Sequence, residues 1–422
     1  REHGIAIDVD RPQRFFADPA VNDRLRRGDT VGCFYLESPA MRQLLVKLAC
    51  DNYLTLVAAS SILRPGVASS GMMAEFIRRH RDPASVRYPH PVFREQLAET
   101  YGVMVYQEDV MKIASAYGGL DMADADVLRR MISRKQPDQV LLCALREKFF
   151  ANCHAKGYDD EVTREIWRQM ESFAGYSFNK AHSASYAVES YQSLYLKTYF
   201  PREFMVAVLN NYGGFYDRKV YINELRRVGG RVQLPCVNHS GVQSVISGES
   251  VYLGFDCLLN LEAELARRIP EERRRGGPYT GLADFVHRTG APLTQLIMLI
   301  RCGAFRFTGV GKKELLWEAH LLLAGDRYSG RPVGQPLFFQ ETTCPVLPPL
   351  QTDPVEDLYD ELELLGFPVS GSMFDLARSP YRGDVTAEAL AGHAGRTVRL
   401  VGDFVLEKTL NTKRGERMQF GT

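Results

Sequence analysis

Neighbouring arginines on a predicted helix are the first candidates for binding a phosphorylated ligand. The stretch 121–135 begins with aspartates and ends with arginines and a lysine, and Asp121 suits a helix N-cap. On such a helix Arg130 and Arg134 lie four residues apart on one face with Arg129 beside them, so their guanidinium groups could bind a triphosphate. The same charge gradient complements the helix dipole without any ligand. Both interpretations are open from the residues alone.

A second group of polar side chains precedes a long helical pattern. We expect a loop here, with Ser183 or Ser185 as the N-cap of the helix that follows. Amide, ammonium, imidazole and hydroxyl groups in such a loop could hold an anion at the helix N-terminus, or they could only cap the helix. A hydrolase triad is disfavoured because His182 and Ser183 are adjacent and no Gly-x-Ser-x-Gly motif occurs. The group consists of Asn179, Lys180, His182, Ser183 and Tyr186.

Two further motifs each have two interpretations. Asp8 and Asp10 would lie on one face of a strand and could hold divalent ions, or they could form a turn before Pro12. In the Gly- and Pro-rich segment after residue 326, Gln335 precedes the adjacent pair Phe338 and Phe339. These rings have no local core to enter, so they could dock into a groove of a partner or fold back onto their own domain.

Composition limits the protein class. A chain of 422 residues needs several domains, and 45% hydrophobic with 24% charged residues is typical of globular proteins. No apolar run approaches the ~20 residues of a membrane span, so no membrane partner is expected. The 52 basic and 51 acidic residues nearly cancel, so any nucleic-acid surface must be local. Eight cysteines without a Cys-x-x-Cys pair indicate free thiols in the cytoplasm.

The elements that must position these residues are mostly helices. Apolar spacing predicts helices through most of the first 230 residues and again over 257–323 and 355–365. Short strands are expected at 232–234 and 251–255, and a β-hairpin from 397–407 and 416–420. The predicted fold class is therefore mainly α with small β segments (α+β), in several domains.

Five segments, taken in order, resemble the bacterial DNA polymerase III alpha subunits, the family C replicative DNA polymerases. The similarity is strong to about residue 215 and looser beyond it. Residues 131–135 depart from the family's usual Ala-Met-Gly-Lys-Lys, and the family's glycine hairpin for duplex phosphates is not recognisable at residues 254–259, so the sequence leaves open whether this region grips duplex DNA. The five segments are residues 32–41, 63–66, 100–108, 125–130 and 173–183.

The resemblance implies an order of domains along a fragment of a longer chain. The family's palm, with its three metal-binding aspartates, would precede Arg1, so Asp8 and Asp10 are not expected to bind metal. We expect no catalytic residue and no metal ligand in this chain, and Mg²⁺ only in the parent enzyme. The implied parts are 1–230, a fingers-like helical domain; 231–325, a helix-hairpin-helix-like clamp- and DNA-binding domain; 326–394, a linker with a clamp-binding peptide and a helical segment; and 395–422, the truncated start of an OB-fold.

The resemblance also implies a function and partners. The parent would add deoxynucleotides to a primer 3′ end in DNA replication in the cytoplasm, and the isolated fragment would be inactive. Arg129 and Arg130 would contact the triphosphate, and the group around Lys180 would line the nucleotide or the template. Gln335, Phe338 and Phe339 match the family's clamp-binding peptide. Expected partners are template-primer DNA, deoxynucleoside triphosphates, the sliding clamp and other replisome subunits. The alternative is a non-catalytic module that binds DNA and the sliding clamp.

Overall fold

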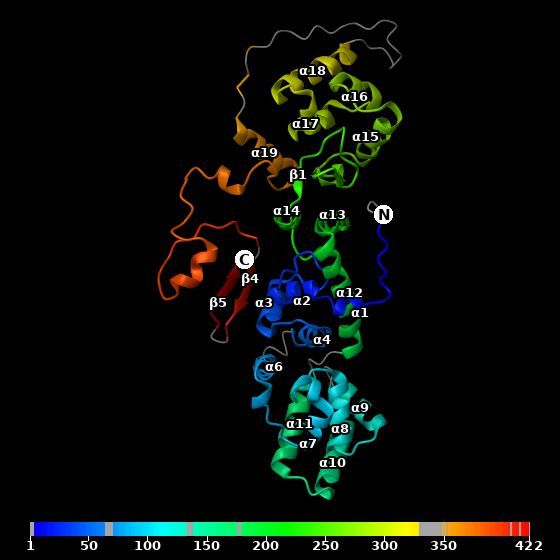
Figure 1. Cartoon of the computed structure of the whole chain (residues 1–422), viewed down its shortest axis with the longest axis vertical. Coiled ribbons are helices and arrows are strands. Elements are labelled where there is room, and N and C mark those ends of the chain that lie inside the picture. Colours follow the sequence, from blue (N-terminus) through cyan, green and yellow to red (C-terminus); the bar gives the residue numbers. More distant parts are fainter. Residues whose placement is uncertain are drawn as a thin grey trace. The chain divides into compact units, whose positions relative to one another are not determined.

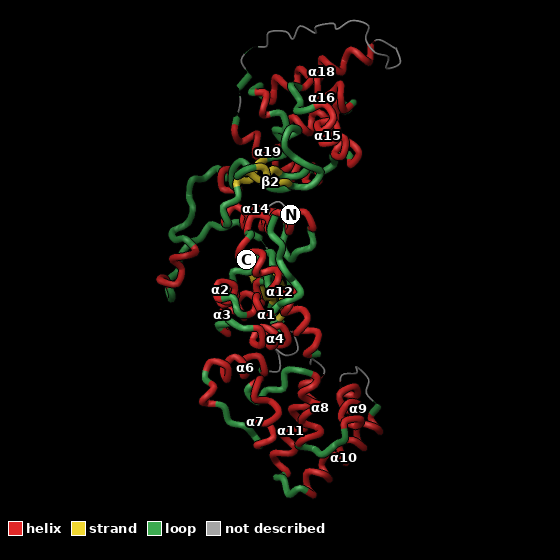
Figure 2. The backbone as a smooth tube through the Cα atoms, turned by 45° about the vertical axis from the view of Figure 1, so that its right-hand side comes forward, coloured by secondary structure: helices red, strands yellow, loops and turns green. Residues whose placement is uncertain are grey.

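The computed structural model describes residues 4–63, 71–132, 138–174, 179–328, 348, 350–351, 353–405, 407–412 and 415–421. The chain divides into two compact units, residues 1–204 and 205–422. Helices predominate in the described residues and the sheets are small, which confirms the predicted fold class (Figures 1 and 2). The finer division into four parts stays a prediction. None of the described helices combines the length and apolar character that a membrane span needs.

The first unit is built from helices joined by short loops. Several begin where the sequence offers a capping side chain: the Asp18, Ser38 and Asn52 side chains each accept a backbone N–H of the following helix. The helices are α1 (Gln13–Phe16), α2 (Pro19–Arg27), α3 (Pro39–Leu48), α4 (Tyr53–Ile62), α6 (Met72–Arg81), α7 (Pro91–Leu97), α8 (Gln107–Ala116), α9 (Met122–Ile132), α10 (Gln139–Ala155), α11 (Asp160–Ala174) and α12 (Lys180–Tyr199). Helix α13 (Pro201–Asn211) crosses into the second unit.

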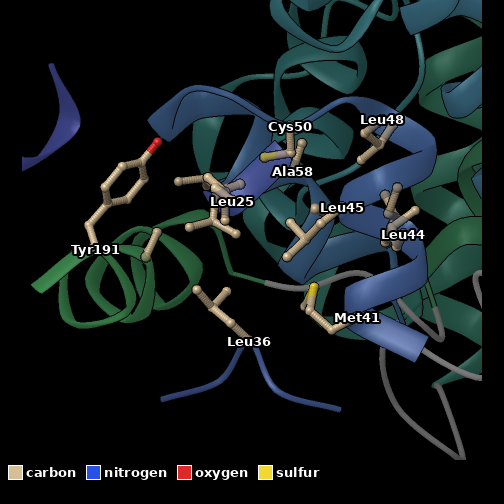
Figure 3. Close-up of a cluster of buried hydrophobic side chains, with 14 of the residues drawn as sticks. Leu25, Leu36, Met41, Leu44, Leu45, Leu48, Cys50, Ala58 and Tyr191 are labelled. Carbon is tan, nitrogen blue, oxygen red and sulfur yellow. The ribbon is translucent and has the colours of Figure 1, made fainter. Parts of the chain in front are cut away.

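Two apolar clusters hold the first unit together. In one, α12 packs on α2 and α4, and its Tyr191 belongs to the same buried cluster as Leu25, Leu36 and Leu45 (Figure 3). The other is formed by the five helices from α7 through α11, with Phe149 and Trp167 among its buried residues. At Gly118 a Cβ atom would lie 2.0 Å from the Phe149 ring, so only glycine allows this packing. Helix α8 packs against α9, and Glu108 in the first turn of α8 contacts Lys180 at the start of α12. Helix α8 therefore contacts both helices that carry predicted site residues.

The second unit combines helices with two small sheets. Strand β3 lies between β1 and β2, parallel to β1 and antiparallel to β2, while β4 and β5 form an antiparallel hairpin. The elements are α14 (Arg218–Arg227), β1 (Arg231–Gln233), β2 (Val245–Ser247), β3 (Ser250–Tyr252), α15 (Ala263–Gly276), α16 (Leu282–Thr289), α17 (Leu293–Arg301), α18 (Lys312–Tyr328), α19 (Pro354–Leu365), β4 (Glu407–Asn411) and β5 (Arg417–Gly421).

The hairpin differs from its prediction at one end. Its first strand was expected over 397–407 but lies at Glu407–Asn411. The register pairs Glu407 with Gly421 and Asn411 with Arg417, so residues before 407 have no partner in β5. A strand needs a neighbour for its backbone hydrogen bonds, and propensity alone does not provide one. The predicted peptide Gln335, Phe338 and Phe339 lies outside the described residues.

Candidate functional site

The paired arginines of α9 share one carboxylate. Nε and Nη2 of Arg129 donate to Asp126 Oδ1 at 2.9 and 2.7 Å, and Arg130 Nη2 lies 2.7 Å from Asp126 Oδ2. The hydrogen bond from Arg129, followed by the charges of both arginines, lowers the pKa of Asp126. The third donor of Arg129, Nη1, reaches Gln107 Oε1 of α8 at 2.9 Å. Both guanidinium groups are therefore positioned by neighbours one helical turn away or on the adjacent helix.

The charge gradient of α9 is used within the protein. The Asp121 carboxylate accepts the Asp124 N–H at 2.8 Å, and Lys148 of α10 pairs with Asp124. Such contacts need no ligand, as the helix-dipole interpretation requires. The Arg130 side chain is nevertheless 55% exposed, against 26% for Arg129. Arg130 can thus reach a ligand while Arg129 stays anchored to α8.

The expected loop before the long helix is already helical. Helix α12 begins at Lys180, and the Asn179 side chain accepts the His182 N–H at 3.0 Å. The predicted N-cap at Ser183 or Ser185 is therefore wrong, because Asn179 supplies the cap one turn earlier. Around the axis of α12, Ser183 is turned about 60° and Tyr186 about 120° from Lys180, so the three side chains contact different neighbours.

Lys180 contacts the beginning of α8. Its backbone N–H lies 3.1 Å from Glu108 Oε2, and its ammonium donates to Glu99 Oε2 at 2.7 Å. The same ammonium lies 5.1 Å from the centre of the Tyr106 ring, which is buried. Gln107 and Glu108, consecutive residues in the first turn of α8, thus contact the Arg129 side chain and the Lys180 backbone, respectively.

Of the remaining predicted residues, Ser183 lies in the core, whereas the rings of His182 and Tyr186 contact each other. Ser183 is buried, and its Oγ lies 2.7 Å from Ser61 Oγ of α4. The His182 and Tyr186 rings are 4.0 Å apart between centres. Tyr186 also contacts the rings of Phe34 and Tyr35. The sequence had given no role to Gln107, Glu108, Phe34 or Tyr35; the only signal was that they fall within segments that resemble the family.

Asp8 and Asp10 lie in a turn, not in the strand that a paired metal site would need. The Asp10 N–H donates to Asp8 Oδ1 at 3.1 Å, and Arg11 Nε lies 3.3 Å from Asp8 Oδ2. In the part of the chain that the structure describes, no group of three or more His, Cys, Asp or Glu side chains is placed to hold a metal ion. The seven described cysteines are free thiols.

In the second unit, apolar residues pack at 254–259, where the family's glycine hairpin is not recognisable in the sequence. Phe255–Cys257 is a turn of 3₁₀-helix in which the Phe255 and Cys257 side chains are buried. Further along, Lys312 Nζ lies 2.7 Å from Asp357 Oδ1, and Lys313 Nζ lies 2.9 Å from Glu356 Oε2. The acidic helix α19 therefore neutralises the cations at the start of α18.

Two regions of the chain match models of known protein families. Residues 1–157 match the bacterial DNA polymerase III alpha subunit finger domain, and residues 229–315 match a helix-hairpin-helix motif. The chain is 33% identical over 377 residues to the DNA polymerase III subunit alpha of Aquifex aeolicus, covering 88% of this chain and 31% of that protein. The Thermus aquaticus subunit is 34% identical over 380 residues, covering 87% and 31%.

An error-prone DNA polymerase of Corynebacterium efficiens is also similar, with 34% identity over 322 residues, 75% of this chain and 29% of that protein. The chain thus spans about a third of the length of these relatives. The two matched regions follow one another in the chain, and the similarity extends over most of its residues. The chain belongs to the family of bacterial DNA polymerase III alpha subunits and contains their finger domain and helix-hairpin-helix motif.

Proposed function

We propose that this chain is part of a DNA-directed DNA polymerase that extends a primer 3′ end during replication in the cytoplasm, and that its first unit supplies contacts to the incoming deoxynucleoside triphosphate. The observation that carries the proposal is that Gln107 and Glu108, consecutive residues in the first turn of α8, contact the Arg129 side chain and the Lys180 backbone, respectively. The helices that carry these two cationic residues are thereby both held to α8, and several cations would suit a ligand with several phosphate charges.

Nucleotide binding would proceed by exchange of anions. Asp126 now occupies the guanidinium groups of both arginines, and Glu99 occupies the ammonium of Lys180. A triphosphate carries more charge than either carboxylate and can accept paired hydrogen bonds from Arg130. Arg129 keeps its orientation because Gln107 holds Nη1. Pre-oriented cations of this kind stabilise the charge that develops during phosphoryl transfer.

The resemblance implies that the Mg²⁺ ions of the polymerase reaction are bound by the palm, outside this chain. We therefore expect the isolated 422-residue chain not to extend a primer. Magnesium-dependent incorporation by the purified chain that is lost on changing Asp8 and Asp10 to Asn would contradict this expectation.

The triphosphate contact can be tested in the full-length protein. Arg129→Ala and Arg130→Ala should raise the KM for nucleotide and lower kcat/KM about 10- to 150-fold, since a charge-assisted contact is worth about 1.5–3 kcal/mol. Arg168→Ala is the matched control, because Arg168 forms the same kind of i,i+3 pair with Glu165 on an exposed face. Unchanged kinetics with a lowered melting temperature would instead support the helix-dipole interpretation.

We further propose that Gln335, Phe338 and Phe339 bind the sliding clamp and that the second unit contacts template-primer DNA beside other replisome subunits. Two Phe side chains buried in a clamp groove, less the cost of ordering the linker, would give an affinity near micromolar. Changing Phe338 and Phe339 to Ala should abolish clamp-dependent processivity and leave distributive synthesis intact. Clamp binding that persists in a direct titration of this double variant would exclude the assignment.

A further inference from the structure

Three cations of the second unit are paired with the acidic helix α19. Arg301 is the last residue of α17, and Lys312 and Lys313 are the first two of α18. Helix α19 packs against α17 (Figure 1), and each cation lies no more than 2.9 Å from one of its carboxylates. We call Arg301, Lys312 and Lys313 the cationic surface. Their carboxylate partners lie on one side of α19 and belong to Glu356, Asp357, Asp360 and Glu363.

The two sides of this contact come from different parts of the chain. The cationic surface lies within residues 229–315, which match the helix-hairpin-helix motif, whereas α19 begins at Pro354. A cleft of about 510 Å³ lies between them and is also lined by Leu316 and Tyr359. The three cationic side chains are 26–39% exposed. They therefore border open space as well as their carboxylate partners, and a ligand with several negative charges can reach them.

The carboxylates hold these cations weakly. The side chains of Glu356, Asp357 and Glu363 are 55%, 50% and 65% exposed. Water screens ion pairs at such positions, so each pair contributes little to the stability of the fold. A row of phosphate groups, by contrast, contacts several cations at once and releases condensed counterions when it binds. The phosphates of a nucleic acid can therefore displace carboxylates from the cationic surface.

The backbone of α19 is held more firmly than these exposed side chains. Leu364 O accepts the Leu259 N–H at 2.7 Å, and the Leu358 and Leu364 side chains are buried. The buried Glu361 carboxylate accepts the Ser370 N–H at 2.9 Å. The helix can therefore stay in place while its exposed carboxylates change partners, so the cations can be freed without unfolding α19.

We propose that the cationic surface binds phosphate groups of duplex DNA and that the carboxylates of α19 compete with them, so that α19 lowers the affinity for DNA. The choice of duplex DNA rests on the proposed function, in which the second unit contacts template-primer DNA. Contacts to phosphates carry no sequence information, so they hold the duplex at any position. A competing anion on the same chain weakens such contacts without removing them, which suits a polymerase that advances along its template.

The test measures binding of a short fluorescein-labelled duplex by fluorescence anisotropy over a series of salt concentrations. The 422-residue chain is compared with its Glu356→Gln/Asp357→Asn variant, which changes only two half-exposed side chains. The matched control is Glu249→Gln/Glu388→Gln, because it removes the same number of negative charges from exposed positions of the same unit. The labelled single strand serves as a second probe.

We expect the Glu356→Gln/Asp357→Asn variant to bind the duplex about tenfold more tightly at low salt, against less than about twofold for the control. Because the freed lysines release counterions on binding, the slope of log affinity against log salt should become steeper by about 1–2. Adding Lys312→Gln/Lys313→Gln should remove this gain. Glu363→Gln changes an exposed partner of Arg301 and should act in the same direction, even if the double variant proves unstable.

Three results would overturn the proposal. These are a gain no larger than that of the control, a gain that persists with Lys312→Gln/Lys313→Gln, and a larger gain for the single strand than for the duplex. Duplex binding by the unmodified chain that the changes in α19 do not alter would refute the competition alone. A chain that binds no duplex, with or without these changes, would refute the proposed DNA contact of the second unit as well.

Discussion

The buried charge of Lys197 can be tested for its contribution to the stability of the first unit. Its ammonium is fully buried, donates to Val31 O at 2.7 Å and lies 3.8 Å from Asp29 Oδ1. Lys197→Met keeps the apolar stem of the side chain but removes the charge and its hydrogen bond. A hydrogen bond to a charged group contributes about 1.5–3 kcal/mol, and loss of its donor also leaves the Val31 carbonyl buried. We therefore expect the free energy of unfolding to fall by about 2–3 kcal/mol.

In a unit of 204 residues this loss corresponds to a decrease in Tm of roughly 5–10 °C, measurable by calorimetry with urea denaturation as a second assay. The matched control is Lys112→Met, because Lys112 also lies 3.8 Å from a carboxylate but is 43% exposed; we expect a change within about 0.5 kcal/mol. A Lys197→Met variant as stable as the wild type would refute the reasoning, because apolar residues can replace buried charges without loss.

Two further predictions concern the residues around α8. Among the described residues the buried Tyr106 hydroxyl has no hydrogen-bond partner, so Tyr106→Phe should raise the free energy of unfolding by about 1 kcal/mol in urea denaturation, and a decrease would show that the hydroxyl is satisfied. Burial raises the pKa of Asp109 from 3.8 to about 6 despite the N–H groups of Val105 and Tyr106. Protonated Asp109 therefore contributes about 3 kcal/mol to the free energy of unfolding below pH ~4. This contribution is lost as the pH rises through 6. The Asn side chain of Asp109→Asn does not titrate. The unfolding free energy of the wild type minus that of the variant should therefore decrease as the pH rises from about 4 to above 6. A difference that does not change with pH would exclude the titration of Asp109.

The sequence by itself determined the local elements and the family. Apolar spacing predicted helices through most of the first 230 residues, and Asp121 was predicted as the N-cap of the helix at Met122–Ile132, because these signals depend on neighbours within one or two turns. The ordered segments identified the family for the same reason, since they can be read without knowing which residues meet in space. The error at Ser183, where Asn179 caps the helix instead, was an error of one turn in a local signal.

Only the tertiary structure decided which side chains act together. Lys197 contacts Val31 across 166 residues of sequence, and Lys180 contacts Glu108 across 72. A lysine is ordinarily exposed, so its burial could not be predicted from its type. Periodicity shows that a helix has faces, but the packed neighbours determine which face is buried. Helix packing therefore placed Ser183 in the core, Tyr186 against the rings of Phe34 and Tyr35, and Lys180 against the first turn of α8, although the three stand within seven residues of one helix.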